Sequence, residues 1–396
     1  MIERGRFSIR IAHFSWETLH SIPVGGISPV VTELAAAQQR MGHEVHVFTR
    51  MGPGQSHYEN IHGVHYHRCS FSFHPDLIQE MHNMSKAMAH EFFNCENYSG
   101  RFDIIHGHDW HVVPALDEIK KTRGHRVVFH FHSTQYGRDG NKFNGGGAEA
   151  IRGLEWYGSY IADRVVALTN AFKEEVKWVH RVPEDKIRIS HNGVHANNFD
   201  GWINPGEIKA RYHIGPLDPT ILFIGRITYM KGPDLLLEAI PEVLRDYPHA
   251  KFIFAGDGDM KPWLERRVHE MGIAHAVRFT GWIKDCKVKA DLYKSCDAVC
   301  VPSRNEPFGV VVLEAWSCGK PVIATHGTGA GEIVWHDVTG LRVYHTPQSI
   351  AWGIKHIFSD FERARWMGGN GRKAAEEAFN WDNIAKSLEN VYKELI

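Results

Sequence analysis

Short apolar runs alternate with longer amphipathic segments along the whole chain. In the first half these runs are bounded by glycine, proline or polar clusters, which predicts β-strands. The predicted strands cover residues 8–14, 44–48, 104–105, 126–132, 165–168 and 187–189. The first helix is predicted to begin with Ser28 as N-cap and Pro29 as its first residue, and to end before Gly42. Regular alternation of this kind predicts an α/β fold whose parallel sheet is covered by helices on both faces.

The same rhythm occurs a second time after an interruption. Residues 193–218 are rich in glycine, proline and asparagine and predict a connector. Beyond it the strand and helix signals resume, and residues 233–245 show the spacing of an amphipathic helix. At 396 residues the chain exceeds the size at which single cores stop growing. We therefore predict two domains, residues 1–200 and residues 201–380, followed by an amphipathic segment at 381–396.

Composition narrows the class of protein. Hydrophobic residues make up 43% and charged residues 23%, as in soluble globular enzymes. A net charge of −1 argues against extended nucleic-acid binding. No apolar run is long enough to cross a bilayer, and residues 1–6 lead directly into the first predicted strand rather than into a signal peptide. The six cysteines include no C-x-x-C pair, so reduced thiols and a cytoplasmic location are expected.

A short basic run at residues 120–126 bears on membrane contact. It predicts either a solvated helix end or a weak peripheral contact with anionic lipid.

The most informative polar pattern follows the buried run at residues 297–301. Glu306 lies on the loop, Pro307 marks a turn, and a helix is predicted to open at Gly309 and to carry Glu314. Ligands of open α/β sheets bind beyond the carboxyl ends of the strands. The free N–H groups at a helix N-terminus attract anions. The pattern therefore predicts an anion site flanked by two carboxylates.

A nucleotide sugar has the chemistry that fits such a site. Glu306 would hold the sugar, the helix N–H groups the phosphates, and Glu314 the ribose. A second strand ends at Arg226, and Lys231 follows before a helix, so two cations are placed to neutralise a diphosphate. The N–H groups in question belong to Phe308, Gly309, Val310 and Val311.

This ordered set of motifs resembles the retaining glycosyltransferases of family 4 and the related glycogen and starch synthases, over nearly the whole chain. The resemblance implies a GT-B fold: two Rossmann-like parallel-sheet domains with a deep interdomain cleft. Residues 1–200 would then bind the acceptor and residues 201–380 the donor. The terminal segment 381–396 would pack back on the first domain.

The resemblance also implies an activity: transfer of a sugar, glucose in the synthases, from a nucleoside diphosphate to a hydroxyl, which in the synthases belongs to an α-glucan. It implies neither cofactor nor metal, because Arg226, Lys231 and the helix N–H groups stabilise the leaving diphosphate. Glu306 would hold the sugar hydroxyls and the developing positive charge. Closure of the domains would exclude water.

Two motifs of the first half fit the same resemblance. Gly25 and Gly26 precede the first helix, where paired glycines permit positive φ and close backbone approach. They resemble the loop that touches the donor phosphates. His132 ends a predicted strand, at the place of the family's histidine that contacts the 6-hydroxyl of the donor sugar. His130 lies on the same face of that strand and is interpreted as a core residue.

The segment His106–His111 leaves three interpretations open. Its three histidines and one aspartate could form a metal site, they could line the acceptor cleft, or they could simply pack. The resemblance to the H-D-W-H of glycogen synthases favours the acceptor cleft, with His108, Asp109 and the later Arg138 as its residues. A metal-dependent hydrolase built on this cluster is the remote alternative.

The acceptor is the least determined part of the prediction. The synthases carry a lysine before the paired glycines, whereas this chain has Val24. A family 4 transferase acting on a small sugar, a sugar phosphate or a lipid-linked acceptor is therefore the alternative.

Overall fold

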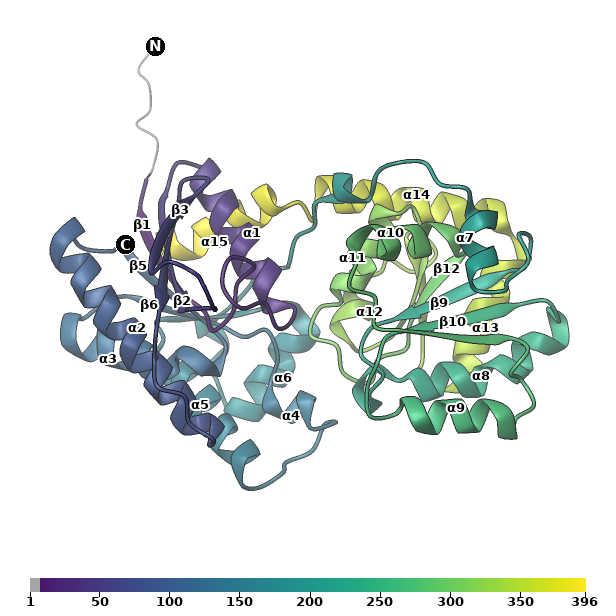
Figure 1. Ribbon diagram of the computed structural model, residues 1–396, viewed down its shortest axis with the longest axis horizontal. Coiled ribbons are helices and arrows are strands. Elements are labelled where there is room, and N and C mark those ends of the chain that lie inside the picture. Colours follow the sequence, from purple (N-terminus) through teal and green to yellow (C-terminus); the bar gives the residue numbers. More distant parts are fainter. Residues whose placement is uncertain (1–7) are drawn as a thin grey trace, which may run out of the picture. The chain divides into compact units, whose positions relative to one another are not determined.

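The computed structural model describes residues 8–396, so residues 1–6, predicted to lead into the first strand without a signal peptide, lie outside the described part. The chain divides into two compact units (Figure 1). Unit 1 contains the described residues up to Asn192 together with Trp381–Ile396, and unit 2 is Gly193–Asn380.

Unit 1 is built on an eight-stranded sheet in the order β3-β4-β2-β1-β5-β6-β7-β8. Its pairs are parallel except for the antiparallel pair β3–β4. The strands are β1 Arg10–Phe14, β2 Glu44–Arg50, β3 Tyr58–Ile61, β4 Val64–Cys69, β5 Ile104–His108, β6 Val127–His130, β7 Arg164–Ala167 and β8 Ile187–Ile189.

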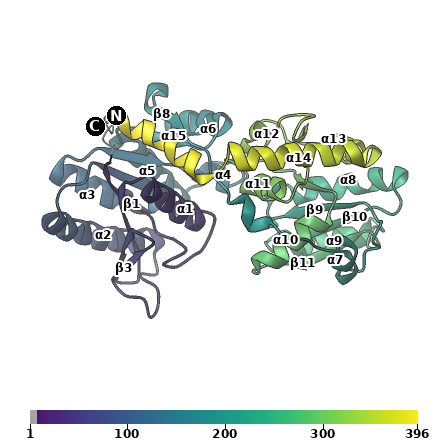
Figure 2. The ribbon, with the colours of Figure 1, turned by 90° about the horizontal axis from the view of Figure 1, so that it is seen from above.

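The helices of unit 1 cover this sheet (Figures 1 and 2). The last of them, α15, packs against α1, and its apolar face joins the core through Ile384, Leu388 and Tyr392. The helices are α1 Ile27–Arg40, α2 Leu77–Ser99, η1 Trp110–Val112, α3 Val113–Arg123, α4 Gln135–Arg138, α5 Gly147–Ile161, α6 Asn170–His180, η2 Glu184–Lys186 and α15 Trp381–Lys393.

Unit 2 is built on a six-stranded, fully parallel sheet in the order β11-β10-β9-β12-β13-β14. Its strands are β9 Thr220–Ile224, β10 Lys251–Ala255, β11 Val277–Gly281, β12 Ala298–Val301, β13 Val322–Thr325 and β14 Gly340–Val343. Its helices are η3 Ala196–Phe199, α7 Pro205–Arg211, η4 Tyr229–Lys231, α8 Pro233–Asp246, α9 Lys261–Glu270, α10 Cys286–Ser295, α11 Val310–Ser317, α12 Gly329–Ile333, α13 Pro347–Ser359 and α14 Phe361–Glu377.

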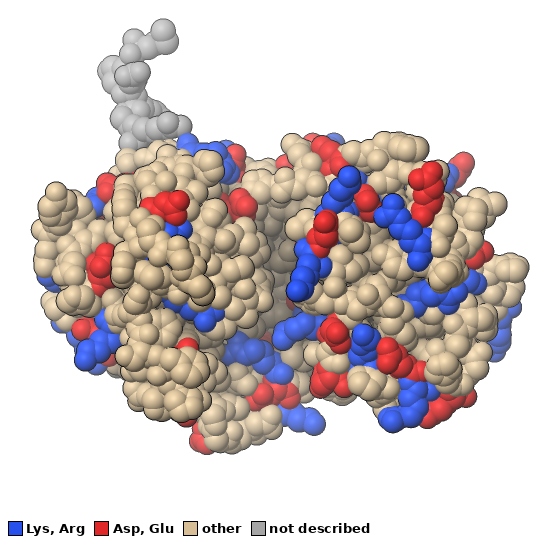
Figure 3. All heavy atoms as spheres, in the orientation of Figure 1, with Lys and Arg blue, Asp and Glu red and all other residues tan. Residues whose placement is uncertain are grey.

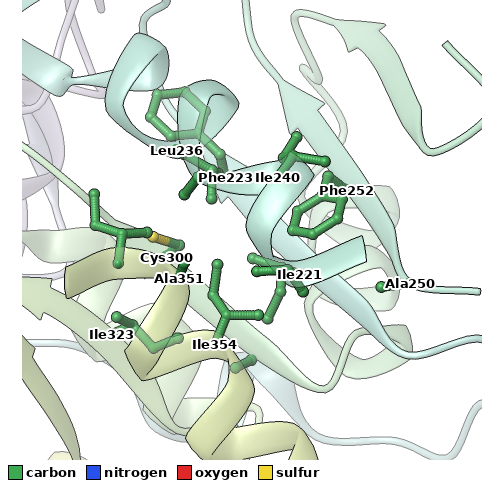
Figure 4. Close-up of a cluster of buried hydrophobic side chains, with 14 of the residues drawn as sticks. Ile221, Phe223, Leu236, Ile240, Ala250, Phe252, Cys300, Ile323, Ala351 and Ile354 are labelled. Carbon is green, nitrogen blue, oxygen red and sulfur yellow. The ribbon is translucent and has the colours of Figure 1, made fainter. Parts of the chain in front are cut away.

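The core of unit 2 lies between the sheet and the helices α8 and α13. Apolar strand residues such as Ile221 and Phe252 meet Leu236 and Ile240 of α8 and Ile354 of α13 (Figure 4). All five are fully buried. The predicted amphipathic helix at 233–245 thus uses its apolar face as expected.

Three predicted details of the local structure differ from what the structure shows. The N-cap of α1 is Gly26, and Ser28 lies inside the helix, where its hydroxyl donates to Glu17 instead of capping. The connector at 193–218 contains η3 and α7 and belongs to unit 2. Strand β6 ends at His130, two residues before the predicted end.

The surface carries charges of both signs, and the cysteines form no disulfide. On the face shown in Figure 3, Lys and Arg side chains lie intermixed with Asp and Glu over both units. All six cysteines are free. Within residues 8–396, no helix combines the length and apolarity needed to span a bilayer.

Candidate active site

The site in unit 2 lies where the chain reverses its direction across the sheet. From β9 the chain builds β10 and β11 on one side, and β12 then returns to the other side of β9. Such a topological switch point is where open α/β sheets bind ligands. Lys231 of η4 follows β9 and Glu306 follows β12. Their side chains form an ion pair, with Lys231 Nζ 2.6 Å from Glu306 Oε2, and are only 20% and 13% exposed.

The loop that carries Glu306 is anchored by its neighbour Arg304. Both terminal nitrogens of Arg304 donate to the carboxylate of Asp234, at 2.8 and 2.6 Å, and its guanidinium lies 4.0 Å from the ring centre of Tyr229. Its backbone N–H donates to the carbonyl of Met230 at 2.7 Å. The loop is thereby fixed beside η4, which holds Glu306 within reach of Lys231.

Two glycine loops meet at the N-terminus of α11. Gly309 caps the helix with φ 96°, and a Cβ added there would lie 2.9 Å from Cβ of Ala330. From the first residue of α12, Gly329 donates its N–H to the carbonyl of Glu306 at 2.7 Å. The first-turn N–H groups of Val310 and Val311 have no intrahelical partner. The close approach of the loops fixes where these N–H groups point.

The side chain of Arg226 is exposed, whereas that of Phe308 is buried. Arg226 is exposed and forms no ion pair with any described residue, so its charge is available to an anion. The side chain of Phe308 is buried against Phe379, with ring centres 6.1 Å apart. Phe308 therefore serves the fold through its ring, and the predicted role concerns its backbone N–H alone.

Glu314 is already held by two side chains of α10. Lys289 Nζ lies 2.5 Å from Oε1, and the hydroxyl of Tyr293 donates to Oε2 at 2.7 Å. Burial and the neighbouring Glu314 raise the pKa of Tyr293 well above its ordinary value, so this hydroxyl remains a donor. Neither partner was predicted from the sequence. Their i, i+4 spacing puts them on one helix face and could have indicated a joint role.

Unit 1 has its own switch point, between β1 and β5. The loop after β1 contains Gly25 and Gly26, and neither has positive φ, so the conformational reason predicted for them is wrong. The buried carboxylate of Glu17 organises this loop: Oε2 accepts from the N–H groups of Val24 and Gly25, at 2.6 and 2.5 Å, and from the hydroxyl of Ser28 at 2.6 Å. A Cβ added to Gly26 would meet no atom within 4 Å, so the space above it is open.

A continuous chain of hydrogen bonds links His132 to the interior. His132 Nε2 lies 2.9 Å from His108 Nδ1, and His108 Nε2 lies 3.0 Å from His13 Nδ1. His13 Nε2 then bonds to Gln38 Oε1 at 2.7 Å, and Gln38 donates to the hydroxyl of Tyr392 at 3.1 Å. Gln38 and Tyr392 lie far in sequence from His108 and His132, and neither was predicted from the sequence.

This series of hydrogen bonds determines which nitrogen of His132 carries the proton. Because Gln38 Oε1 can only accept, His13 donates from Nε2 and accepts at Nδ1. His108 and His132 must then also donate from Nε2, which leaves Nδ1 of His132 as an acceptor. Burial lowers the pKa of His132 to about 3, so the ring is neutral at physiological pH.

Asp109 positions His132 through the backbone. Its Oδ1 accepts from the N–H of His132 at 2.7 Å, and burial raises the pKa of its own carboxyl to about 7. Asp109 also has a strained backbone, with φ 58° and ψ 176°, a kind of strain that clusters at functional sites. The contacts of Asp109 therefore support a role beside His132.

Arg138, predicted for the acceptor, is occupied within unit 1. Its guanidinium lies 2.8 Å from the buried carboxylate of Glu155, and donates to Ser133 at 2.5 Å and Gln135 at 3.0 Å. These contacts indicate that Arg138 fixes the segment that contains Ser133 and Gln135, after β6.

The segment 106–111 does not form a metal site of its own. His106 and His108 belong to histidine groups gathered from β1, β5 and the end of β6, whereas Asp109 and His111 belong to no described group with metal-ligand spacing. The side chain of Asp109 is directed to the backbone of His132 instead. Within the predicted cluster, His106 and His108 thus join other histidines, whereas Asp109 bonds to the backbone of His132.

Comparison with known sequences identifies both halves of the chain. The sequence model of "Glycosyl transferases group 1" matches residues 206–374, and that of "Glycosyltransferase Family 4" matches residues 24–198. An uncharacterized glycosyltransferase of Methanocaldococcus jannaschii is 37% identical over 97% of this chain and 98% of its own length. A D-inositol 3-phosphate glycosyltransferase of Thermobispora bispora is 32% identical over 75% of this chain and 72% of its own. A glycogen synthase of Mycobacterium tuberculosis is 25% identical over 97% and 94%.

Solved structures agree on the fold. A sucrose-phosphate synthase from Thermosynechococcus elongatus superposes with a TM-score of 0.79 at 24% identity, covering 98% of this chain and 99% of its own. The catalytic domain of starch synthase IV from Arabidopsis thaliana gives a TM-score of 0.75 at 16% identity, with coverage of 98% and 99%. The two parallel-sheet units therefore have the GT-B architecture, and the predicted fold class is confirmed. The chain belongs to the glycosyltransferases, with a family 4 N-terminal half and a group 1 C-terminal half.

Proposed function

We propose that the protein is a retaining hexosyltransferase that moves glucose from a nucleoside diphosphate to a hydroxyl of an α-glucan. The observation that carries the proposal is the Lys231–Glu306 ion pair at the switch point of unit 2. The 25% identity with a glycogen synthase over 97% of this chain supports the choice of sugar and acceptor.

The ion pair prepares unit 2 for a donor that carries both a diphosphate and a sugar. The phosphates of the donor would give Lys231 a new anionic partner. Glu306 would then be released to accept hydrogen bonds from the sugar hydroxyls and to face the positive charge of the transition state. Arg226, which is exposed and forms no ion pair with described residues, would supply further positive charge to the leaving diphosphate.

The first-turn N–H groups of α11 add a fixed positive potential at the same sheet edge. Gly309 and Gly329 hold them in place by backbone-to-backbone packing. Positive charge for the leaving group thus comes from this chain's own groups, and the proposal needs no cofactor.

The transfer itself exchanges one bond for another. The bond between the anomeric carbon and the phosphate oxygen breaks, and the acceptor oxygen attacks from the same face. The acceptor's proton passes to the leaving phosphate. Configuration at the anomeric carbon is therefore retained, as the resemblance to family 4 implies.

In unit 1, the neutral imidazole of His132 has one nitrogen, Nδ1, that can accept a hydrogen bond. Nδ1 of His132 would accept a hydrogen bond from a sugar hydroxyl, because the histidine chain commits Nε2 as the donor. The open space above Gly26 would let the donor phosphates approach the backbone there.

A smaller acceptor is the second candidate. Val24 replaces the lysine of the synthases, and the D-inositol 3-phosphate glycosyltransferase has the higher identity, 32% over 75% of this chain, against 25% over 97% for the glycogen synthase. A sugar phosphate or a lipid-linked acceptor would use the same donor chemistry.

A donor and acceptor screen tests the proposal. Purified protein is incubated with ADP-, UDP- or GDP-glucose, with glycogen, with inositol phosphate or with no acceptor, and release of the nucleoside diphosphate is measured. Release that rises with glycogen and yields an α-linked product supports glucan synthesis. Release that rises only with the phosphate selects the second candidate. No release and no binding of any donor contradicts the proposal.

A further inference from the structure

A second cluster of possible ligands lies away from both switch points, on the face of the unit 1 sheet that α2 covers. His46 is on β2, His67 on β4 and Cys95 on α2. His46 Nδ1 lies 3.0 Å from His67 Nε2, and Cys95 Sγ lies 3.6 Å from the first of these nitrogens and 3.8 Å from the second. Three ligand atoms from three elements therefore converge on one point.

The spacing fits a tetrahedral ion. Zinc binds nitrogen at about 2.0 Å and sulfur at about 2.3 Å, so its nitrogen ligands lie about 3.3 Å apart and a nitrogen and a sulfur about 3.5 Å apart. The three observed separations, 3.0, 3.6 and 3.8 Å, are close to these values. A thiolate with two imidazoles is a donor set that binds zinc in preference to the hard cations.

The outer nitrogens of the two histidines supply the second observation. His46 Nε2 lies 3.0 Å from a carboxylate oxygen of Glu44, and His67 Nδ1 lies 3.2 Å from one of Glu91. A carboxylate only accepts, so each imidazole must place an N–H on its outer nitrogen. Metal-binding histidines are held by carboxylates in this way.

The consequence is a conflict that a cation resolves. If both rings are neutral, their inner nitrogens face one another across 3.0 Å with lone pairs alone. Either an additional proton or a metal ion must lie between them. The thiol of Cys95, close to both nitrogens, provides the third lone pair that a metal needs and a shared proton does not.

The histidine chain of the candidate active site differs in this respect. There Gln38 accepts at one end, and one proton on each ring satisfies every contact from His132 to His13. No carboxylate is bonded to an outer nitrogen of that chain in the hydrogen bonds of the described residues. The donor set favours the His46–His67–Cys95 cluster as the metal site.

The surroundings would restrict exchange with water without closing the site. The ring of Phe48 stacks on His67, with centres 4.6 Å apart, and the ring of Phe102 stands nearly perpendicular to that of His46, with centres 4.9 Å apart. Cys95 is only half-buried, and its sulfur lies 3.6 Å from the hydroxyl of exposed Ser99. An ion could enter on this side and keep a water as its fourth ligand.

We infer that His46, His67 and Cys95 bind one zinc ion, which ties α2 to strands β2 and β4. The site is separate from the residues proposed for glycosyl transfer. Its role is to stabilise unit 1, because a bound ion raises the free energy of unfolding.

Cobalt substitution tests the site directly. The protein is freed of metal with a chelator and titrated with Co²⁺ and then with Zn²⁺. Cys95→Ser is compared with the matched control Cys286→Ser, because Cys286 is exposed and lies outside the cluster. One equivalent of Co²⁺ should give the thiolate-to-cobalt charge-transfer absorption of a tetrahedral site, and Zn²⁺ should displace it. Cys95→Ser should abolish the band and weaken zinc binding by at least 100-fold, while Cys286→Ser keeps both.

A second variant separates binding from folding. Glu91→Gln leaves all three ligands in place and removes only a carboxylate that orients His67, and loss of such a partner weakens metal binding about 10–100-fold. The far-ultraviolet circular dichroism of each metal-free variant shows whether it is folded. Folded wild-type protein that gives no charge-transfer band, or a band that persists in Cys95→Ser, overturns the inference.

Discussion

Replacing Gly309 by alanine tests whether the contact between the two glycine loops positions the α11 N-terminus. Gly309 has φ 96°, and an L-residue held in this region costs roughly 1–2 kcal/mol. The added Cβ would lie 2.9 Å from Cβ of Ala330, whereas carbon atoms in contact prefer about 3.5–4.0 Å. The loops must therefore separate by roughly 0.5–1 Å, and overpacking of this kind costs about 1–3 kcal/mol.

The two terms together predict a loss of about 2–5 kcal/mol in the stability of unit 2, which corresponds to a fall in Tm of about 4–20 °C for a domain of this size. The effect on catalysis should be larger than stability alone explains, because a displacement near 1 Å can cost on the order of 100-fold in rate. Release of nucleoside diphosphate at a temperature where both proteins are folded measures kcat/KM for the variant and the wild type.

Gly272→Ala is the matched control. Gly272 also has positive φ, 67°, but a Cβ there meets no atom within 4 Å, and the residue lies after α9. This control should show the backbone strain in Tm and leave kcat/KM unchanged. If Gly309→Ala keeps kcat/KM within about threefold of the wild type while folded, the loop contact does not position the site.

Two further predictions concern charge. Lys231→Met should raise KM for the donor at least tenfold and lower kcat, because it removes a cation from the diphosphate. Lys287→Met on the exposed face of α10 should change neither constant. Equal kinetics of the two variants would contradict the role of Lys231. Burial lowers the pKa of His13 to about 4 and that of His132 to about 3, so below about pH 6.5 the unfolded chain binds protons that the folded protein does not. Stability is therefore fully present above pH 6.5 and should fall by up to about 1.4 kcal/mol per pH unit for each histidine as the pH drops toward 4. Thermal unfolding measured between pH 8 and pH 4 checks this slope, and a flat profile would contradict the neutral buried histidines.

The sequence predicted those parts of the fold that are written in local patterns. Continuous apolar runs located β1, β9 and β12, and the loops that follow these last two strands carry Arg226, Lys231 and Glu306. The cap at Gly309 followed from the turn chemistry of its loop. Strand β4, with the sequence VHYHRC, was missed because it carries two histidines and an arginine, of which His67 and Arg68 are buried, so its residues do not form an apolar run.

The contacts that organise the sites were beyond sequence reasoning because they join distant segments. The Lys231–Glu306 pair spans 75 residues, and the bond between His106 and Tyr392 spans 286. Glu17 was missed because nothing in its own neighbourhood indicates that its carboxylate turns back to the N–H groups of Val24 and Gly25. Ser28 illustrates the reverse: its local pattern predicts an N-cap, and the competing bond to Glu17 prevents it.

The central claim is that Glu306 and its partners process a nucleotide sugar, and release of nucleoside diphosphate from the best glucose donor tests it most directly. The assay compares wild type with Glu306→Gln and with Glu265→Gln, which changes an exposed glutamate of α9. Glu306→Gln should lower kcat by about 100–1000-fold, as loss of a group that stabilises transition-state charge does. Glu265→Gln should match the wild type. Turnover by Glu306→Gln that equals the wild type would contradict the account.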